Sequence, residues 1–251
     1  MLPDLQQFAV ILPVLPFAVF IGGAIGLTGI GGVLLVPLLV YYAGLDVRDA
    51  VPAALAAFVF TGITGSWLQA RTVSGVGWPH FALMATAGLG AAGGVWLVER
   101  SDPVWPLTIL ALFTIVSGLA GVMMTPAPSN GRSLRTGAAA TLGAPVGLFS
   151  ALTGTGGPVV LVPILMAMRL PAHTIVTMAQ FVQIPIGVLA TLTAIALGRG
   201  SIVLALVIGP VLAVGALAGS WLHARVPAAG LHKLLSVLLI LFGVLTLLPR
   251  L

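Results

Sequence analysis

Residues 28–37 read TGIGGVLLVP and lie within one of the most apolar stretches of the chain. Nearly the same string, TGTGGPVVLVP, occurs again at residues 153–163, which begin 125 positions later. Glycine and proline are the two residues that destabilise a helix most. Because this helix-breaking string occurs once in each half of a hydrophobic chain, it indicates that a break in the helix is part of the fold.

The composition is typical of a membrane protein. Apolar residues make up 59% of the 251 positions, charged residues make up 6%, and the mean hydropathy is +1.21. A soluble domain usually carries about a quarter charged residues, so this chain cannot cover itself with a water-compatible surface. Its apolar runs predict transmembrane helices of roughly 20 residues each. The eight expected regions are approximately 8–42, 50–68, 78–98, 104–124, 137–168, 174–198, 201–222 and 231–248.

The first and fifth of these regions are too long for one straight span, and each contains a TG-x-GG string. We therefore expect an all-α integral membrane protein in which these two regions are broken or re-entrant. The N-terminal MLPDLQQF carries no positive charge ahead of the first apolar run, so we expect a retained membrane helix and no cleaved signal peptide.

The two halves of the chain match at an offset of 125 positions, and an internal duplication is the simplest explanation. The matching pairs include Gly22 with Gly147, Gly62 with Gly187, Gly90 with Gly215, Gly94 with Gly219 and Trp96 with Trp221. We expect one membrane domain over residues 1–251, with a first repeat at about 8–124 and a second at about 133–249. Four spans per half would leave the repeats parallel, whereas a broken segment that crosses the membrane twice gives five crossings per half and inverts them. We favour inverted repeats, because inversion builds two access states from one sequence.

Several classes of function are excluded by the residues that the chain lacks. The chain has no cysteine, which excludes thiol chemistry, thiolate metal sites and disulfides. None of the five acidic residues or four histidines lies in the middle of an expected span. The sequence therefore predicts no enzyme, no cofactor, no metal site and no nucleic-acid partner.

The two glycine strings allow two interpretations. In one, the glycines only permit close packing or a kink. In the other, the helix unwinds, and backbone N–H groups at the start of the next helical piece attract an anion. Paired discontinuous helices are typical of secondary transporters, so we favour the second interpretation. The candidate substrate-binding residues in the strings are Thr28, Gly29, Gly31, Gly32, Thr153, Gly154, Thr155, Gly156 and Gly157.

A substrate site that arose by duplication becomes specific where its two halves differ. Three apolar positions of the first half, Ile30, Leu55 and Phe58, correspond to Thr155, Gln180 and Gln183 in the second. Gln180 and Gln183 lie three apart and share a helix face. Such amides either bond neighbouring helices together or donate hydrogen bonds to substrate oxygens. We add both glutamines to the candidate site and expect the second half to be its more discriminating part.

Asp46 and Asp49 lie in the short link before the second apolar region. We expect them at the membrane interface, where they cap the helix that starts near residue 50. A role in proton coupling is the alternative, because acids within membranes serve as proton relays.

The glycine strings, each followed closely by proline in a short duplicated membrane protein, resemble the signature of the sulfite exporter TauE/SafE family. The residues that carry this resemblance are Gly29, Gly31 and Gly32 with Pro37, and Gly154, Gly156 and Gly157 with Pro163. The resemblance implies a multi-pass permease for sulfur-containing anions such as sulfite or sulfonates in the bacterial inner (plasma) membrane. Its partners are then a small anionic substrate and the lipid bilayer, and a homo-oligomer is compatible with the sequence.

We therefore expect a secondary transporter that works by alternating access and holds its anion at the paired breaks. An anion channel, or a permease for another small organic anion, is the alternative. Channels often form rings of identical subunits, whereas this chain is duplicated internally.

Overall fold

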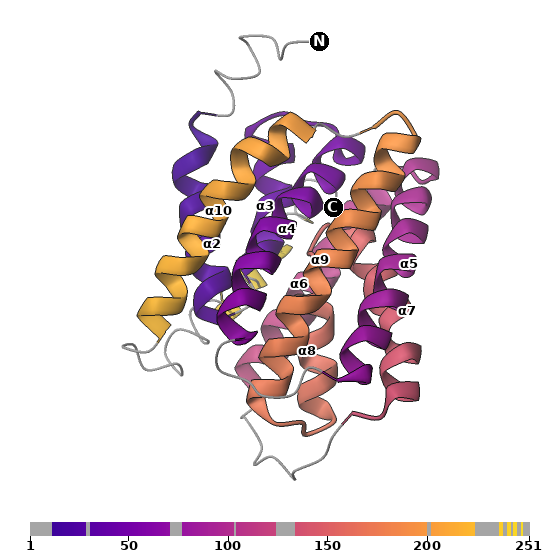
Figure 1. Ribbon diagram of the computed structural model, residues 1–251. Helices are drawn as coiled ribbons and strands as arrows, with labels where there is room; N and C mark the ends of the chain where they lie inside the picture. The colour runs from indigo at the N-terminus through magenta and orange to yellow at the C-terminus, as the bar shows by residue number, and fades with distance from the viewer. Residues whose placement is uncertain are drawn as a thin grey trace.

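All regular structure in the described part of the chain is helical (Figure 1). The computed structural model describes residues 12–28, 31–70, 77–102, 104–123, 134–199 and 202–223, with single positions between 236 and 247. Its helices follow the apolar regions in order. They are α2 (Val14–Thr28), α4 (Val47–Ala70), α5 (Trp78–Arg100), α6 (Val104–Met123), α7 (Thr136–Thr153), α8 (Pro158–Ala167), α9 (Ala172–Ala196) and α10 (Ile202–His223).

Within the described residues, five segments are long and apolar enough to cross a membrane: Val47–Gln69, Trp78–Arg100, Thr136–Thr153, Thr174–Ala196 and Ile202–Leu222. Shorter apolar helical segments cover Val14–Leu27, Gly31–Tyr42, Val104–Leu119 and Pro158–Ala167. The outward faces of the bundle carry large apolar side chains, such as Leu112 at 53% and Val214 at 62% exposure. A helical bundle with apolar residues on its outside is suited to lipid, so the protein is membrane-embedded. The expected region 231–248 falls largely outside the described residues.

Both long apolar regions are broken at the glycine strings, as predicted. The helix α7 ends at Thr153 and α8 begins at Pro158. In the first half, α2 ends at Thr28, and the described chain resumes with three short helical turns, η1 (Gly31–Leu34), α3 (Leu35–Pro37) and η2 (Leu38–Tyr42). The rings of Phe17 and Tyr42 lie 5.8 Å apart, so the chain after the break returns to the start of α2 as a hairpin.

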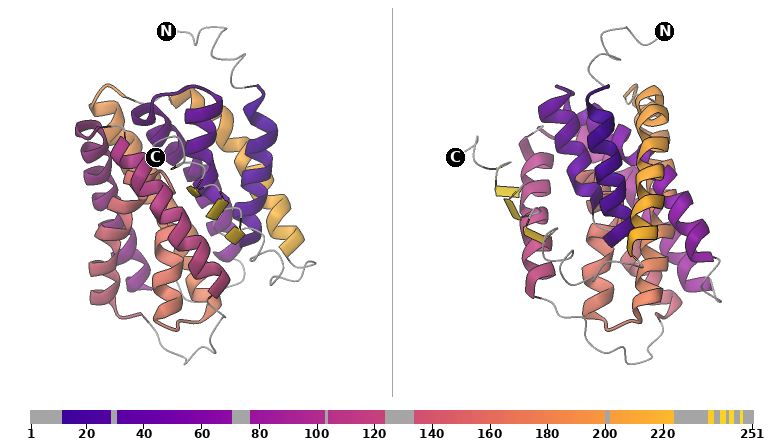
Figure 2. Two further views of the ribbon diagram at one scale, coloured as in Figure 1. Left: turned by 180° about the vertical axis from the view of Figure 1, so that it is seen from behind. Right: turned by 90° about the vertical axis from the view of Figure 1, so that its left-hand side faces the viewer.

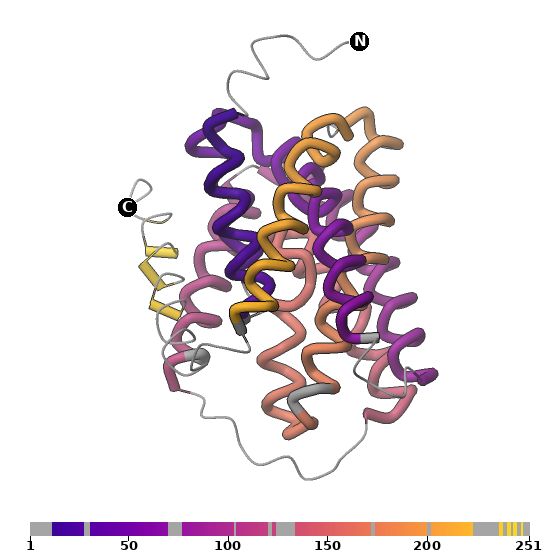
Figure 3. Tube along the Cα trace, turned by 60° about the vertical axis from the view of Figure 1, so that its left-hand side comes forward, coloured from indigo at the N-terminus to yellow at the C-terminus, as the bar shows by residue number. Residues whose placement is uncertain are grey.

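The first helix of each hairpin packs against a helix of the other half, α2 against α10 and α7 against α5. Figure 1 shows α2 beside α10 on one side of the bundle and α5 beside α7 on the other, with α4 and α9 between them. The α2–α10 pair can be followed in the tube view of Figure 3. A Cβ atom on Gly22 would overlap the carbonyl of Leu212, and one on Gly147 would overlap that of Ala87. Glycine lets these helix backbones approach closely, as is common in membrane helices.

These two contacts are equivalent in the two repeats, because the offset of 125 relates Gly22 to Gly147 and Ala87 to Leu212. Within each pair the helices run parallel. A Cβ on Gly90 would meet the carbonyl of Ala144, and one on Gly94 would meet that of Leu148 four residues further along α7.

The central helices α4 and α9 cross with opposite directions. A Cβ on Gly62 would lie 2.9 Å from Cβ of Gln183, whereas a Cβ on Gly187 would lie 2.5 Å from the carbonyl oxygen of Leu55. Residue numbers therefore rise along α4 as they fall along α9. The same relation holds between α6 and the C-terminal positions, which Figure 2 shows beside it. A Cβ on Gly118 would lie 2.6 Å from the Ser236 carbonyl oxygen, and a Cβ on Gly243 would lie 2.7 Å from that of Ala111.

Candidate functional site

The break between α7 and α8 is built by glycines in conformations that other residues rarely adopt. The φ angles of Gly154, Gly156 and Gly157 are 64°, 76° and 116°. The N–H of Thr155, between them, donates to the carbonyl of Ser150 at 3.0 Å and so closes the end of α7. Without a Cβ atom, glycine takes positive φ at little cost, and this explains the glycine run in the second string.

Helix α8 starts with backbone N–H groups directed out of its first turn. Pro158 occupies the first helical position, where its missing N–H is not needed. The carbonyl of Gly157 accepts the N–H groups of Val160 and Leu161 at 3.1 and 3.0 Å. Among the described residues, no backbone carbonyl accepts the N–H of Gly156 or Gly157. This end of α8 carries the positive end of the helix dipole, equivalent to about half an elementary charge.

The two breaks lie against each other at the α4–α9 crossing. A Cβ on Gly32 would lie 3.4 Å from the carbonyl oxygen of Thr155 and 3.0 Å from Cζ of Phe58. A Cβ on Gly156 would lie 2.7 Å from Cδ2 of the same ring, and one on Gly154 would meet the side chain of Val36. The ring of Phe58, 1% exposed, thus fills the space between the two strings.

A chain of buried polar groups joins α4 to α9 beside the breaks. The hydroxyl of Thr61 donates to Oε1 of Gln183 at 2.9 Å, and Nε2 of Gln183 donates to Oε1 of Gln180 at 2.8 Å. All three residues are buried. In this conformation Gln183 bonds the two halves of the chain together, which is the first of the two roles that the sequence left open.

The hydroxyls of the second break are also paired internally. Thr153 donates its hydroxyl hydrogen to the carbonyl of Phe149 at 2.7 Å, and its oxygen lies 3.0 Å from the hydroxyl oxygen of Thr155. Because a threonine has one hydroxyl hydrogen, Thr155 is then the donor of the second bond. Ser150, one turn earlier, is buried, and its hydroxyl has no hydrogen-bond partner among the described residues.

The structure brings most of the predicted string residues together. Gly31, Gly32 and residues 153–157 are all buried at the place where the breaks meet. Gly157 lies against α9, where its Cβ would come 2.8 Å from Val182 and 3.0 Å from Ile186, on either side of Gln183. Gly29 and the side chain of Thr28 lie outside the described residues.

The two predicted aspartates lie elsewhere. Asp46 precedes α4, and its Oδ1 accepts the N–H of Arg48 at 2.7 Å, which confirms its capping role. Asp49 forms an ion pair with Arg199 at 3.9 Å. It comes nine residues before Phe58, so it lies about 13 Å from the breaks along α4. Proton coupling through either aspartate stays a prediction.

The groups that the described residues contribute to the site are neutral. The described side chains that adjoin the glycines are apolar, and the buried polar side chains of the described part are uncharged amides and hydroxyls apart from His80. An anion here could be held by backbone N–H groups, hydroxyls, amides and the dipole of α8, without a cationic side chain.

Sequence reasoning missed Thr61, which completes the polar chain from the first half. The comparison of the halves looked for polar residues that the second half had gained, whereas Thr61 is polar where its counterpart Ile186 is apolar. A comparison that also looks for polar residues found only in the first half identifies Thr61.

A comparison with models of protein families identifies the family of this chain. Neither a search of curated proteins nor a search of solved structures gives a match. A family model described as Sulfite exporter TauE/SafE matches residues 12–246, a range that contains both breaks and every helix named above. The chain therefore belongs to the sulfite exporter TauE/SafE family of membrane transporters.

Proposed function

We propose that the protein is a secondary transporter, a permease or exporter, of a small sulfur-containing anion such as sulfite or an organosulfonate. It works by alternating access in the bacterial inner membrane. The observation that carries this proposal is the meeting of two glycine breaks of a TauE/SafE chain at the crossing of α4 and α9. Paired discontinuous helices at the interface of two repeats are how many secondary transporters bind their substrates.

The repeats of about 8–124 and 133–249 are inverted in this proposal. The antiparallel crossing of α4 and α9 supports it, because the offset of 125 makes these helices counterparts. A two-fold axis along the membrane normal would leave counterpart helices parallel. An axis in the membrane plane makes them antiparallel, and this is the symmetry that lets one sequence build two access states.

The anion binds at the second break. The N–H groups of Gly156 and Gly157 and the dipole of α8 offset its charge, and Thr155, Gln180 and Gln183 contact its oxygens. In the conformation described, Thr155 and Gln183 are occupied by protein partners. Substrate oxygens accept hydrogens, so when the halves move apart they take the place of the Thr153 hydroxyl oxygen and of Oε1 of Gln180, which accept the hydrogens of Thr155 and Gln183.

Counterflow in proteoliposomes tests this proposal. Vesicles are preloaded with unlabelled sulfite, thiosulfate, taurine, sulfoacetate or acetate, and the labelled form of the same compound is added outside. We expect transient, saturable accumulation of a sulfur-containing anion and none of acetate. Dissipative flux without accumulation would instead support an anion channel. No flux of any compound through folded protein would reject the proposal.

A further inference from the structure

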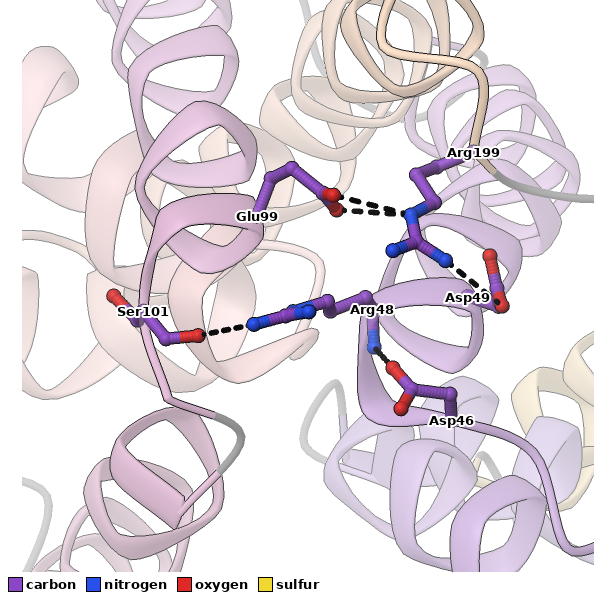
Figure 4. A network of polar contacts seen from close by, with 6 residues as sticks. All are labelled: Asp46, Arg48, Asp49, Glu99, Ser101 and Arg199. Carbon is purple, nitrogen blue, oxygen red and sulfur yellow. Dashed lines mark hydrogen bonds and ion pairs between the residues drawn. The ribbon is translucent and has the colours of Figure 1, made fainter.

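One end of the bundle carries a group of charged residues that joins the two halves (Figure 4). Arg199, just after α9, donates from Nε to both carboxylate oxygens of Glu99 on α5, at 3.2 and 3.1 Å. A guanidinium NH group of Arg199 lies 3.9 Å from the carboxylate of Asp49 on α4. We call Arg199, Glu99 and Asp49 the Arg199 cluster. It ties the second half of the chain to two helices of the first.

The first-half side of this cluster is held in place by further bonds. The guanidinium of Arg48 donates to the carbonyl of Ser101 at 2.8 Å and so joins the start of α4 to the end of α5. Asp46 caps α4 in the same turn. Glu99 and Asp49 are therefore presented to Arg199 by a braced pair of helix ends, as Figure 4 shows.

The positions in the other half that correspond to the Arg199 cluster are uncharged. The offset of 125 converts Glu99 into Ala224 and Asp49 into Thr174, and it relates Arg199 to Ser74. None of these counterparts carries a charge, so they cannot form the same ion pairs. A transporter whose inverted halves move symmetrically would thus carry this cluster on one side and its uncharged counterparts on the other.

The strength of the cluster suits an interaction that must break repeatedly. The side chains of Arg199, Glu99 and Asp49 are 34%, 24% and 38% exposed, so water screens their attraction. The hydrogen bond and charge of Glu99, with smaller effects of Asp49 and Asp46, raise the pKa of Arg199. The guanidinium of Arg199 therefore stays positively charged. Exposed pairs of this kind shift an equilibrium by about two- to fivefold, enough to bias a conformation without fixing it.

We propose that the Arg199 cluster is a one-sided latch, which closes the seam between α4 and α9 at its face and breaks when the transporter opens there. A small cavity lies in this seam, lined by Pro52, Ala53, Ala56, Thr191, Ala194 and Arg199 among others. Opening the latch widens this cavity into a path for solvent. The latch rests on the alternating access proposed above.

The natural absence of cysteine makes the latch directly testable, since a single introduced thiol is the only one that reacts. Ala56→Cys places it in the seam cavity. A membrane-impermeant maleimide is then applied from the face of Arg199 to protein in oriented vesicles without substrate. We expect slow labelling, which Arg199→Gln or Glu99→Gln accelerates about two- to fivefold.

Two controls separate latch opening from general loosening. Arg100, beside Glu99, stacks on the ring of Trp96 with its guanidinium carbon 3.8 Å from the ring centroid, and Arg100→Gln should leave the labelling rate unchanged. The double variant Arg199→Gln/Glu99→Gln should label no faster than Arg199→Gln alone, because Arg199→Gln already removes the pair with Glu99. If Arg199→Gln does not fold, the labelling rate of Glu99→Gln still tests the latch.

The outcomes distinguish the latch from the transport function. Faster labelling without counterflow of any anion would support the latch and reject the proposed transport. Counterflow with equal labelling rates in the unlatched and latched proteins would reject the latch and leave transport standing. Equal acceleration by Arg100→Gln would overturn the latch as well, since it would point to a loosened helix end.

Discussion

The glycines of the second break are the residues on which the proposed site depends most directly. Gly157 has a φ of 116°, a conformation that a residue with a Cβ atom avoids at a cost of about 1–3 kcal/mol. Its backbone is also proposed to face the substrate. A substitution there should damage the site while the helices on either side remain packed.

We expect Gly157→Leu to lower the initial rate of counterflow by at least about tenfold, because an off-position contact in a binding site costs this much or more. Gly93→Leu is the matched control, since a Cβ at Gly93 meets no atom within 4 Å. Both proteins should elute as folded species in size-exclusion chromatography. Normal transport by Gly157→Leu would remove the second break from the site.

Gln183 should contribute to stability as well as to substrate contact, because it bonds Thr61 of the other half. Gln183→Leu removes the donor to the buried Oε1 of Gln180, which costs about 1–3 kcal/mol, while the Thr61 hydroxyl keeps the carbonyl of Phe58 at 3.0 Å as an acceptor. Adding Thr61→Val should cost less than the sum of the two single changes by about 0.5 kcal/mol or more. Thermal unfolding in detergent measures all three variants, and strictly additive losses would argue against the bond.

At the scale of the element, the sequence predicted where the helices break, and the bounds of α7 and α8 confirm it. A glycine run has this predictive value because its effect on the backbone is local. The sequence did not predict that Phe58 fills the space between the breaks, or that Gln183 pairs with Thr61. Both contacts depend on how α4 crosses α9, which periodicity along either helix leaves undetermined. The role of the string residues in binding stays a prediction.

Helix α7 packs closely against the backbone of α5 at Gly147. We expect Gly147→Leu to destabilise the protein by about 1–3 kcal/mol or more, because its side chain would force α7 away from the backbone of α5. Gly137→Leu, on the same helix, should be tolerated because a Cβ there meets nothing within 4 Å. The midpoint of thermal unfolding and the yield of monodisperse protein report the difference. Equal midpoints for the two variants would contradict the packing described.

At the scale of the whole molecule, the directions of the helices show at which end of the bundle each charged residue lies. Arg135 precedes α7, which runs parallel to α5, so it lies at the opposite end of the bundle from Glu99 and Asp102. In a membrane these two ends face different compartments.

We therefore expect single cysteines at Asp102 and Arg135 to react with an impermeant maleimide from opposite sides of the membrane. The cysteine-free chain serves as the background. Right-side-out vesicles should label one variant and inside-out vesicles the other. Labelling of both from one side would overturn the arrangement of crossings.

The exchange of hairpins between the halves also governs how the protein is made. Helix α2 leaves the ribosome early, yet its closest partner contacts, at Leu212 and Ala216, are translated about 190 residues later. Until α10 arrives, the first hairpin has no surface on which to bury its glycine face, and contacts this distant in sequence form slowly. The contact of α2 with α10 therefore forms late, after the α5–α7 pair has been made. A ribosome that stops before residue 223 leaves both halves unfinished, and membrane quality control has a long interval in which to remove them.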